Sequence, residues 1–314
     1  MPDLSIIIVC WNSIPDLQRC LPALPGSCRG HRCEVILIDN GSAEDPTDLA
    51  RSLLPDAVCL RNSGNAGFAA ANNQGIRIAR GRYVVLLNPD TMVHEGAFDH
   101  LLEFMDGNPR VWACGPALLN GDGSPQRTGV AFPGLWNLFV ESLFLDRLFP
   151  ESRMFGSHRE LYADMHSPRQ VDFVQGSCLL VRRSAIEAVG GLDESFFMYF
   201  EETDWCKRIR QSGGQVWIVP AARVVHFGGD AFAHYDERRL VNYHVSLFRY
   251  FRKHAPRWEG LLVRAIIAFR SLIRLMLWTA IALMSRGTVR VKALSSVKGY
   301  LRICHMVFRF RGTT

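Results

Sequence analysis

The chain has 314 residues, of which 48% are hydrophobic and 21% are charged, a composition typical of a folded globular protein. This composition excludes disordered, collagen-like and coiled-coil classes. The net charge of +6 is uneven, because residues 251–314 hold 13 of the 36 Lys and Arg but only one of the 30 Asp and Glu.

The nine cysteines are scattered and form no CxxC pair. This pattern predicts reduced thiols, no zinc site and a cytoplasmic setting. The N-terminal residues lack a basic region before an apolar run, so we expect no signal peptide. No stretch reaches about 18 uncharged apolar residues, so a clean transmembrane helix is not expected.

The first part of the chain alternates apolar strands with helical patterns, which predicts βαβ units and a mostly parallel sheet. The expected strands are Leu4–Cys10, Cys33–Ile38, Ala57–Leu60 and Tyr83–Leu87. The expected helices are Pro15–Leu24, Asp45–Leu54 and Gly67–Ala79. Polar residues follow each strand, and in such sheets ligands bind beyond the carboxyl ends of the strands.

A Gly- and Pro-rich stretch at 120–134 interrupts the alternation, which then resumes. The later expected elements are a helix at 136–149, a strand at Val171–Arg182, a helix at Glu201–Gln211 and short strands at Val216–Val219 and Arg223–His226.

Two apolar but basic helices are expected in the tail, over Leu261–Met284 and Val289–Phe310. Arg264, Arg270 and Arg274 fall on one side of the first, which leaves a broad apolar face. Such helices can lie in an anionic membrane interface. The alternative is a helical pair packed on the main domain with its arginines solvated. Nucleic acid is disfavoured because the apolar face would remain exposed.

Candidate metal ligands follow the Tyr83–Leu87 strand. Asn88 and Asp90 place two oxygen side chains beyond a buried strand, where Mg²⁺ or Mn²⁺ can bind together with phosphates. An ordinary Asn-Pro-Asp turn is the alternative. His226 ends a later strand and can be a third ligand through its neutral imidazole, or simply a satisfied, partly buried histidine.

Two further carboxylate positions are candidates for chemistry. Asp39 follows the second strand, where it can accept hydrogen bonds from a base or ribose, or cap a turn. Glu201, Glu202 and Asp204 follow an aromatic run, where loss of solvation makes a carboxylate a better general base near neutral pH. These acids can instead stabilise a helix N-terminus.

Together these segments resemble the family-2 inverting glycosyltransferases with a GT-A fold, specifically the bacterial rhamnosyltransferase-like branch. The resemblance covers about residues 4–255. The segments that carry it are SIIIVCWNS (5–13), VILIDNGS (35–42), RNSGNAGFAAANNQGI (61–76), YVVLLNPDT (83–91), VDFVQGSCLLVRR (171–183), GGLDESFFMYFEETDWCKRIRQSGG (190–214) and VVHFGG (224–229).

The resemblance implies a GT-A domain over 1–255, with a nucleotide-binding half at about 1–119 and an acceptor half at about 170–255, followed by a basic amphipathic tail over 256–314. It also implies roles for individual residues. The nucleotide-binding residues would be Trp11, Asn12, Asp39, Asn65, Gly67 and Phe68; the metal residues Asp90, Asn88 and His226; and the acceptor-side residues Gly176, Ser177 and Trp205.

Glu202 matches the general base of the family, with Glu201 and Asp204 as alternates. Two departures stand out: Asn88 replaces the usual first aspartate of the metal motif, and Glu202 replaces an aspartate. The implied activity is transfer of a sugar from a nucleotide diphosphate, with inversion and with Mg²⁺ or Mn²⁺, to a hydroxyl of a glycan or polyprenyl-diphosphate-linked acceptor. This activity would serve cell-surface polysaccharide synthesis at the inner face of the cell membrane.

The implied donor is dTDP-rhamnose, with UDP- and GDP-sugars as alternatives. Another nucleotide-utilising enzyme is disfavoured because no glycine-rich phosphate loop follows the first strand. A catalytically silent protein that keeps the fold is the remaining alternative, supported only by the departures at Asn88 and Glu202.

Overall fold

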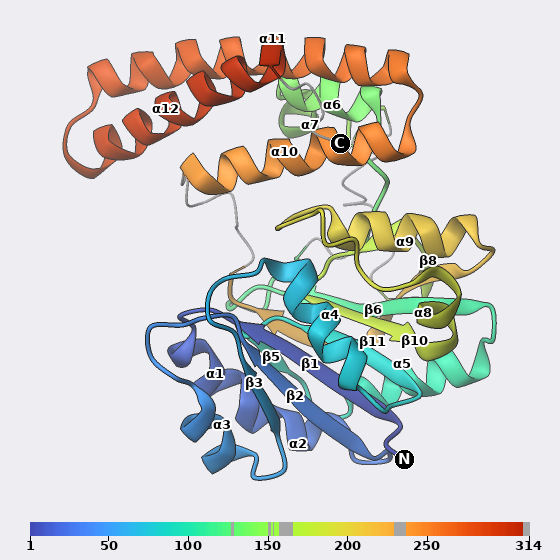
Figure 1. The fold of residues 1–314 in the computed structure, drawn as a ribbon. Helices are drawn as coiled ribbons and strands as arrows, with labels where there is room; N and C mark the ends of the chain where they lie inside the picture. The colour runs from blue at the N-terminus through green and yellow to red at the C-terminus, as the bar shows by residue number, and fades with distance from the viewer. Residues whose placement is uncertain (127–128, 150–151, 153, 157–165, 229–236, 310–314) are drawn as a thin grey trace. The chain divides into compact units, whose positions relative to one another are not determined.

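The computed structural model describes residues 1–126, 129–149, 152, 154–156, 166–228 and 237–309 (Figure 1). Contacts within the chain divide it into two compact units. The first unit comprises Met1–Phe132, Tyr162–Phe197 and Glu201–Gly229, and the second comprises Pro133–Leu161, Met198–Phe200 and Asp230–Thr314.

The first unit is built on one mixed sheet, in the order β3-β2-β1-β4-β10-β6-β11-β5, with β8 also paired to β11. Its strands are β1 (Leu4–Cys10), β2 (Cys33–Asp39), β3 (Val58–Arg61), β4 (Tyr83–Leu87), β5 (Thr91–Val93), β6 (Val111–Leu119), β8 (Arg169–Gln170), β10 (Cys178–Arg182) and β11 (Gln215–His226). The strands β1 to β4 run parallel, β10 runs antiparallel between β4 and β6, and β6 pairs in parallel with β11. A separate short ladder joins β7 (Gly129–Val130) to β9 (Phe173–Val174).

Helices cover both faces of this sheet. They are α1 (Ile14–Cys20), the 3₁₀ turn η1 (Leu21–Ala23), α2 (Leu24–Ser27), α3 (Thr47–Leu53), α4 (Phe68–Ile78), α5 (Ala97–Gly107), α8 (Arg183–Val189) and α9 (Glu201–Gln211). Successive β1 side chains enter different cores: Ile6 and Ile8 pack with α1 and α5, whereas Ile7 packs with α4 and α9. This alternation is what a strand buried on both faces requires.

Several predicted bounds are confirmed, and others differ for physical reasons. The strands β1 and β4 and the helix α9 have the predicted limits. The two short strands predicted at 216–226 are one strand, β11, whose register shifts between Val219 and Arg223. The strand predicted over 171–182 is divided into β9 and β10 by the loop that contains Gly176 and Ser177.

The second unit is helical and larger than the tail predicted over 256–314. Its helices are α6 (Leu135–Ser142), α7 (Leu145–Leu148), α10 (Glu237–His254), α11 (Arg257–Met284) and α12 (Gly287–Arg309). By length and composition alone, α11 could cross a membrane. In the structure, 22% of its most apolar 18-residue stretch is buried. Arginines interrupt the apolar sequence of α11, which is why no long uncharged run marks it.

The arginines of α11 are not on a solvated face. Arg270 is buried and donates to Ser142 Oγ and Leu138 O of α6 and to Glu141. Arg274 reaches Glu141 O and lies over the Phe144 ring. The alternative prediction placed the arginines of this helical pair in solvent. That part of it is wrong, because Arg270 and Arg274 face α6.

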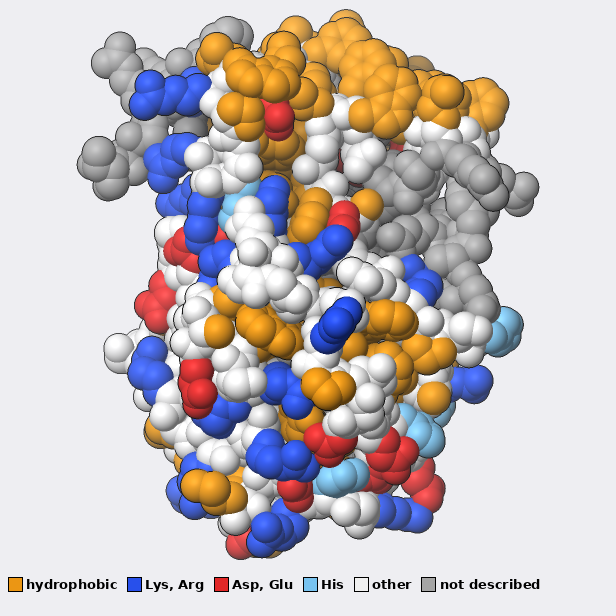
Figure 2. Space-filling model, turned by 90° about the vertical axis from the view of Figure 1, so that its right-hand side faces the viewer, with side chains coloured by type: hydrophobic (Ala, Val, Ile, Leu, Met, Phe, Trp, Pro, Cys, Tyr) orange, Lys and Arg blue, Asp and Glu red, His pale blue; other side chains and the backbone are white. Residues whose placement is uncertain are grey.

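The opposite side of α11 exposes its large apolar side chains. Figure 2 shows hydrophobic side chains gathered at the top of the view, over the helices of this unit. The exposed apolar residues of α11 include Leu261, Phe269, Leu272, Met276 and Leu283. Their spacings of eight, three, four and seven residues are close to whole turns of a helix, so these side chains share one face.

One prediction about the cysteines is wrong. Cys28 and Cys33, on either side of the turn that leads into β2, form a disulfide. Seven cysteines are free, and the most buried of them, such as Cys114 and Cys178, are packed in the sheet as small apolar groups.

Candidate active site

Asp39 lies at the carboxyl end of β2 and is almost completely buried. Its Oδ1 accepts a hydrogen bond from the Ser42 N–H at 3.0 Å. Its Oδ2 is 3.1 Å from Arg61 Nε, but it accepts no hydrogen bond within the described residues. A buried carboxylate oxygen with unused acceptor capacity suits a base N–H or a ribose hydroxyl.

The residues after β1 form the neighbouring wall. Asn12 has a left-handed backbone with φ of 54°, its N–H donates to Ser42 Oγ at 2.8 Å, and its Oδ1 accepts from the Ala43 N–H at 2.9 Å. A shallow pocket is lined by Asn12, Ile14, Pro15, Ala43 and Glu44. Trp11 is 52% exposed, so its ring is available for stacking.

Asn40 organises the loop before α4, a role that sequence reasoning missed. Its Oδ1 accepts from Asn62 Nδ2 and the Ala66 N–H, both at 3.0 Å. Its Nδ2 donates to Asn65 Oδ1 at 3.0 Å and to Gly67 O at 3.3 Å. All four amide positions of this buried side chain are therefore used to hold the loop against β2. The only signal in the sequence was an asparagine directly after a strand.

The start of α4 connects the loop held by Asn40 to α9. Gly67 has φ of +89°, and a Cβ there would lie 2.7 Å from the Phe197 ring and from its carbonyl oxygen. Phe68 N–H donates to that carbonyl at 2.7 Å. A Cβ at Gly176 would lie 3.6 Å from Phe68 Cε1 and 3.7 Å from Glu202 Cβ. Phe68, Gly176 and Glu202 therefore come together.

Two adjacent carboxyl groups begin α9 in a desolvated environment. Burial raises the pKa of Glu202 to about 7. Burial, followed by the neighbouring Glu202, raises the pKa of Glu201 well above its ordinary value. Each side chain has a buried Oε2 that makes no hydrogen bond among the described residues. A carboxyl group with a pKa near the working pH suits proton removal.

The other candidates on α9, Asp204 and Trp205, are buried and bonded to neighbouring residues of the protein. Asp204 is fully buried, and its Oδ2 pairs with Arg208 Nε at 2.8 Å. Trp205 is also fully buried, and its Nε1 donates to Gly190 O at 2.8 Å. It packs in the core and exposes no surface to an acceptor. Ser177 is buried beside the site, and its Oγ makes no hydrogen bond among the described residues.

Two candidate metal residues, Asp90 and His226, come together where the turn between β4 and β5 lies against the end of β11, and Asn88 lies two residues before Asp90 in that turn. Asn88 N–H donates to Ser177 O at 2.9 Å, which ties this turn to the Gly176 loop. His226 pairs in register with Thr91, and its Nε2 lies 3.4 Å from Asp90 Oδ1. Two ligands of one Mg²⁺ or Mn²⁺ at about 2.1 Å stand about 3.0 Å apart, so this pair fits a hard divalent cation with small adjustment.

Gly228 keeps this cradle open, a second role that sequence reasoning missed. A Cβ at this position would lie 2.1 Å from Asp90 Oδ2 and 3.7 Å from His226 Nε2. The Asp90 carboxylate therefore occupies space that any other residue would fill.

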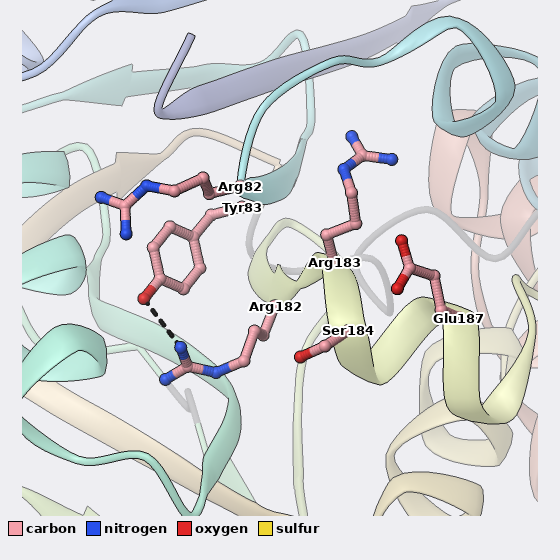
Figure 3. A pocket seen from close by; sticks show the side chains of 6 residues that line it. All are labelled: Arg82, Tyr83, Arg182, Arg183, Ser184 and Glu187. Carbon is pink, nitrogen blue, oxygen red and sulfur yellow. Dashed lines mark hydrogen bonds between the residues drawn. The ribbon is translucent and has the colours of Figure 1, made fainter. Parts of the chain in front are cut away.

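Two other features lie at the opposite edge of the sheet. A pocket of about 330 Å³ is lined by Arg82, Tyr83, Arg182, Arg183, Ser184 and Glu187 (Figure 3). Tyr83 begins β4 and Arg182 ends the antiparallel β10, so this pocket is away from Asp90. Its arginines are already bonded: Arg82 to Asp3 and Asp106, Arg182 to carbonyls and Tyr83 Oη, and Arg183 to carbonyls.

Cys28, His31 and Asp99 are also close enough to hold a metal ion. However, Cys28 is in the disulfide, and Asp99 accepts hydrogen bonds from Arg29 and Gly30 N–H and contacts His31 Nδ1. This cluster is explained by closure of the turn before β2.

Comparisons of the sequence with known proteins find one family of enzymes, the glycosyltransferases. The family model described as Glycosyl transferase family 2 matches residues 5–190. The chain is 29% identical over 283 residues to the N-acetylglucosaminyl-diphospho-decaprenol L-rhamnosyltransferase of Mycobacterium tuberculosis, covering 85% of this chain and 91% of the relative. It is 26% identical to the rhamnosyltransferase WbbL of Escherichia coli, and the match covers 68% of this chain and 86% of that relative. It is 25% identical to the dTDP-rhamnosyl transferase RfbF of Shigella flexneri, and the match covers 73% of this chain and 70% of that relative.

A solved structure shows the same fold at low identity. The mannosyltransferase PcManGT from Pyrobaculum calidifontis, in complex with GDP-Man and Mn²⁺, matches with a TM-score of 0.55 and 17% identity. The match covers 99% of this chain and 88% of that one. The predicted fold class and the predicted resemblance to the rhamnosyltransferase-like branch are confirmed.

Proposed function

We propose, because the chain belongs to glycosyl transferase family 2, that it transfers L-rhamnose from dTDP-rhamnose to a hydroxyl of a glycan or polyprenyl-diphosphate-linked acceptor. The relatives named rhamnosyltransferases support this sugar, and one of them is named for the dTDP-linked donor. The relative from Mycobacterium tuberculosis is named for a diphospho-decaprenol acceptor, which supports a lipid-linked acceptor and a role in cell-surface polysaccharide synthesis.

One observation carries this proposal: a continuous series of contacts within the first unit joins the Asn40 loop, Glu202 and the pair formed by Asp90 and His226. Asn40 holds the Gly67 loop, and Phe68 and Glu202 meet at Gly176. The next residue, Ser177, accepts from Asn88, two residues before Asp90. Donor, cation and acceptor would therefore share one edge of the sheet, as ligands do in open α/β sheets.

Asp90 and His226 would hold the divalent cation, with Asn88 beside them as a neutral oxygen ligand. The Mn²⁺ in the complex of PcManGT with GDP-Man supports a cation of this kind. When bound, such a cation offsets the negative charge that the diphosphate gains as it leaves the sugar. Asp39 would orient the nucleotide through Oδ2, which accepts no hydrogen bond among the described residues, with Trp11 and Asn12 flanking the base and Asn65, Gly67 and Phe68 shaping the adjacent wall.

Glu202 would act as the general base. Inversion requires the acceptor hydroxyl to attack the face of the sugar opposite the diphosphate, while a carboxylate removes its proton. The carboxyl group beside Gly176 and Phe68 has lost solvation, and its pKa of about 7 leaves a substantial ionised fraction at neutral pH. No covalent intermediate on the protein is needed, because a single displacement inverts the anomeric centre.

The second unit would place the enzyme on the inner face of the cell membrane. The face of α11 opposite Arg270 exposes Leu272 and Met276, which are 55% and 67% exposed. Arg286 and Arg290, at the turn into α12, are exposed as well. An apolar face flanked by cations suits an in-plane helix on an anionic lipid surface, where a polyprenyl-linked acceptor would be concentrated.

The test measures nucleotide binding and sugar transfer together. Thermal midpoints are measured with dTDP, UDP and GDP, with and without Mn²⁺, because a ligand that binds only the native state raises the midpoint. We expect the largest Mn²⁺-dependent rise with dTDP, and transfer of rhamnose from dTDP-rhamnose that is lost in Asp90→Ala and Glu202→Gln. A larger rise with UDP or GDP would show that the donor is a UDP- or GDP-sugar and not dTDP-rhamnose. Binding without transfer would favour a catalytically silent protein.

A further inference from the structure

Gln126 contacts His226 at two points, although the two residues are 100 positions apart in the sequence. The turn after β6 is closed by Asn120 and Ser124, and a bridge between Leu119 and Pro125 brings the chain back beside β6. From there, Gln126 Nε2 donates to the main-chain carbonyl of His226 at 2.5 Å. Its Oε1 lies 3.0 Å from His226 Nδ1.

These two contacts determine which way the amide of Gln126 points. Only an NH₂ group can donate to a carbonyl oxygen, so Nε2 must face the main chain of His226. The reversed amide would place two oxygens against each other. The atom that faces Nδ1 is therefore an acceptor with no hydrogen of its own.

The orientation of the amide in turn determines where the imidazole carries its hydrogen. A hydrogen bond between Oε1 and Nδ1 exists only if Nδ1 is protonated. In neutral His226 the lone pair is then on Nε2, the atom that faces Asp90 Oδ1 at 3.4 Å. Two lone pairs facing each other at this distance repel, and a cation between them removes the repulsion.

We propose that Gln126 is a positioning residue that fixes the Nδ1–H tautomer and the ring orientation of His226, so that Nε2 is offered to the divalent cation together with Asp90. This inference rests on the proposed function for the presence of the cation, but not for the tautomer. Gln126 serves as the amide counterpart of the carboxylate or carbonyl that usually accepts from a metal-binding histidine.

The first experiment reads the tautomer without any metal. The protein is labelled with ¹⁵N-histidine, and the two ring nitrogens of His226 are observed at about pH 8, above the pKa of about 6.5 of free histidine. The chain has ten histidines, and His226→Ala identifies the correct signals by their disappearance. We expect Nδ1–H in the wild type. Gln126→Glu keeps an acceptor for Nδ1 but loses the hydrogen bond to the His226 carbonyl, so it should retain the Nδ1–H preference at a lower thermal midpoint, whereas Gln126→Leu should lose the preference. An Nε2–H tautomer in the wild type would overturn the inference.

The second experiment measures Mn²⁺ affinity by the electron paramagnetic resonance of free Mn²⁺, in the presence of saturating dTDP. Gln126→Leu should bind Mn²⁺ about 10–100-fold more weakly, the usual effect of removing such a partner. Gln126→Glu should recover most of the affinity. Gln170→Leu, at an exposed position on β8, removes the same amide elsewhere and should bind as the wild type does.

The two experiments separate the inference from the proposed function. If the wild type binds neither dTDP nor Mn²⁺, the proposed function fails, while the tautomer still tests the role of Gln126. If the wild type binds Mn²⁺ and Gln126→Leu binds it equally well with the same tautomer, the inference alone is refuted. A purely structural role would lower the thermal midpoint without changing either readout.

Discussion

The substitution Glu202→Gln should stabilise the protein above neutral pH while abolishing transfer. Burial raises the pKa of Glu202 from 4.5 to about 7 in the folded state, so the folded protein binds this proton more tightly than the unfolded chain does. The free energy of unfolding therefore falls as pH rises from about 4.5 to about 7. A rise of this size in pKa corresponds to about 3 kcal/mol. Glutamine keeps the shape without the charge and avoids this loss.

The assay is denaturant unfolding of the wild type and Glu202→Gln between about pH 5 and pH 9, followed by tryptophan fluorescence. The stability difference in favour of the variant should grow to about 3 kcal/mol above pH 7 and then stay constant. Asp204→Asn is the control, because it removes a carboxylate two residues away that pairs with Arg208. That variant should be destabilised by about 3–5 kcal/mol. A difference for Glu202→Gln that does not change with pH would refute the reasoning.

Three further substitutions test other parts of the structure. Gly67→Ala, at φ of +89°, should lower the free energy of unfolding by about 1–3 kcal/mol in a urea titration; an unchanged value would contradict the requirement for glycine. Gly228→Ala should weaken Mn²⁺-dependent dTDP binding at least about tenfold in calorimetry, because its Cβ would meet Asp90. Leu272→Gln with Met276→Gln should reduce binding to phosphatidylglycerol vesicles at least about tenfold without changing dTDP binding. Equal sedimentation of this double variant and the wild type with vesicles would exclude this face from membrane contact.

The parts of the fold that could be predicted are those in which local sequence and tertiary burial agree. The strands β1 and β4 are continuous apolar runs, and both are buried throughout or nearly so, so their limits are visible in the sequence. In β11, Pro220 lies where the register to β6 shifts. Because proline is unfavourable inside a strand, the sequence predicts two short strands where the structure has one. The disulfide between Cys28 and Cys33 could not be predicted, because it depends on the turn that precedes β2.

Only part of the candidate site was visible for a similar reason. Asp39, Asp90 and His226 stand at the ends of recognisable strands, which makes them candidates from chain order alone. Asn40 and Gln126 act through partners in other segments, and a single amide in a loop gives no pattern. The arginines of α11 show the same limit: their arc on the helix was correct, but which face packs inward depends on Glu141 of α6.

The direction of β10 explains how two separate halves of the chain can build one site. In a purely parallel sheet, the residues before a strand lie at the edge opposite the ligands. Because β10 runs antiparallel to β4, Cys178 pairs with Leu87, and the residues that precede β10 lie at the carboxyl edge of β4. Ser177 can therefore accept from Asn88, and Gly176 can meet Phe68 and Glu202. Past β10, β6 again runs in the direction of β4, and its partner β11 delivers His226 to the same edge. A parallel β10 would place Gly176 and Ser177 at the edge of Tyr83, away from the Asp90 and His226 pair.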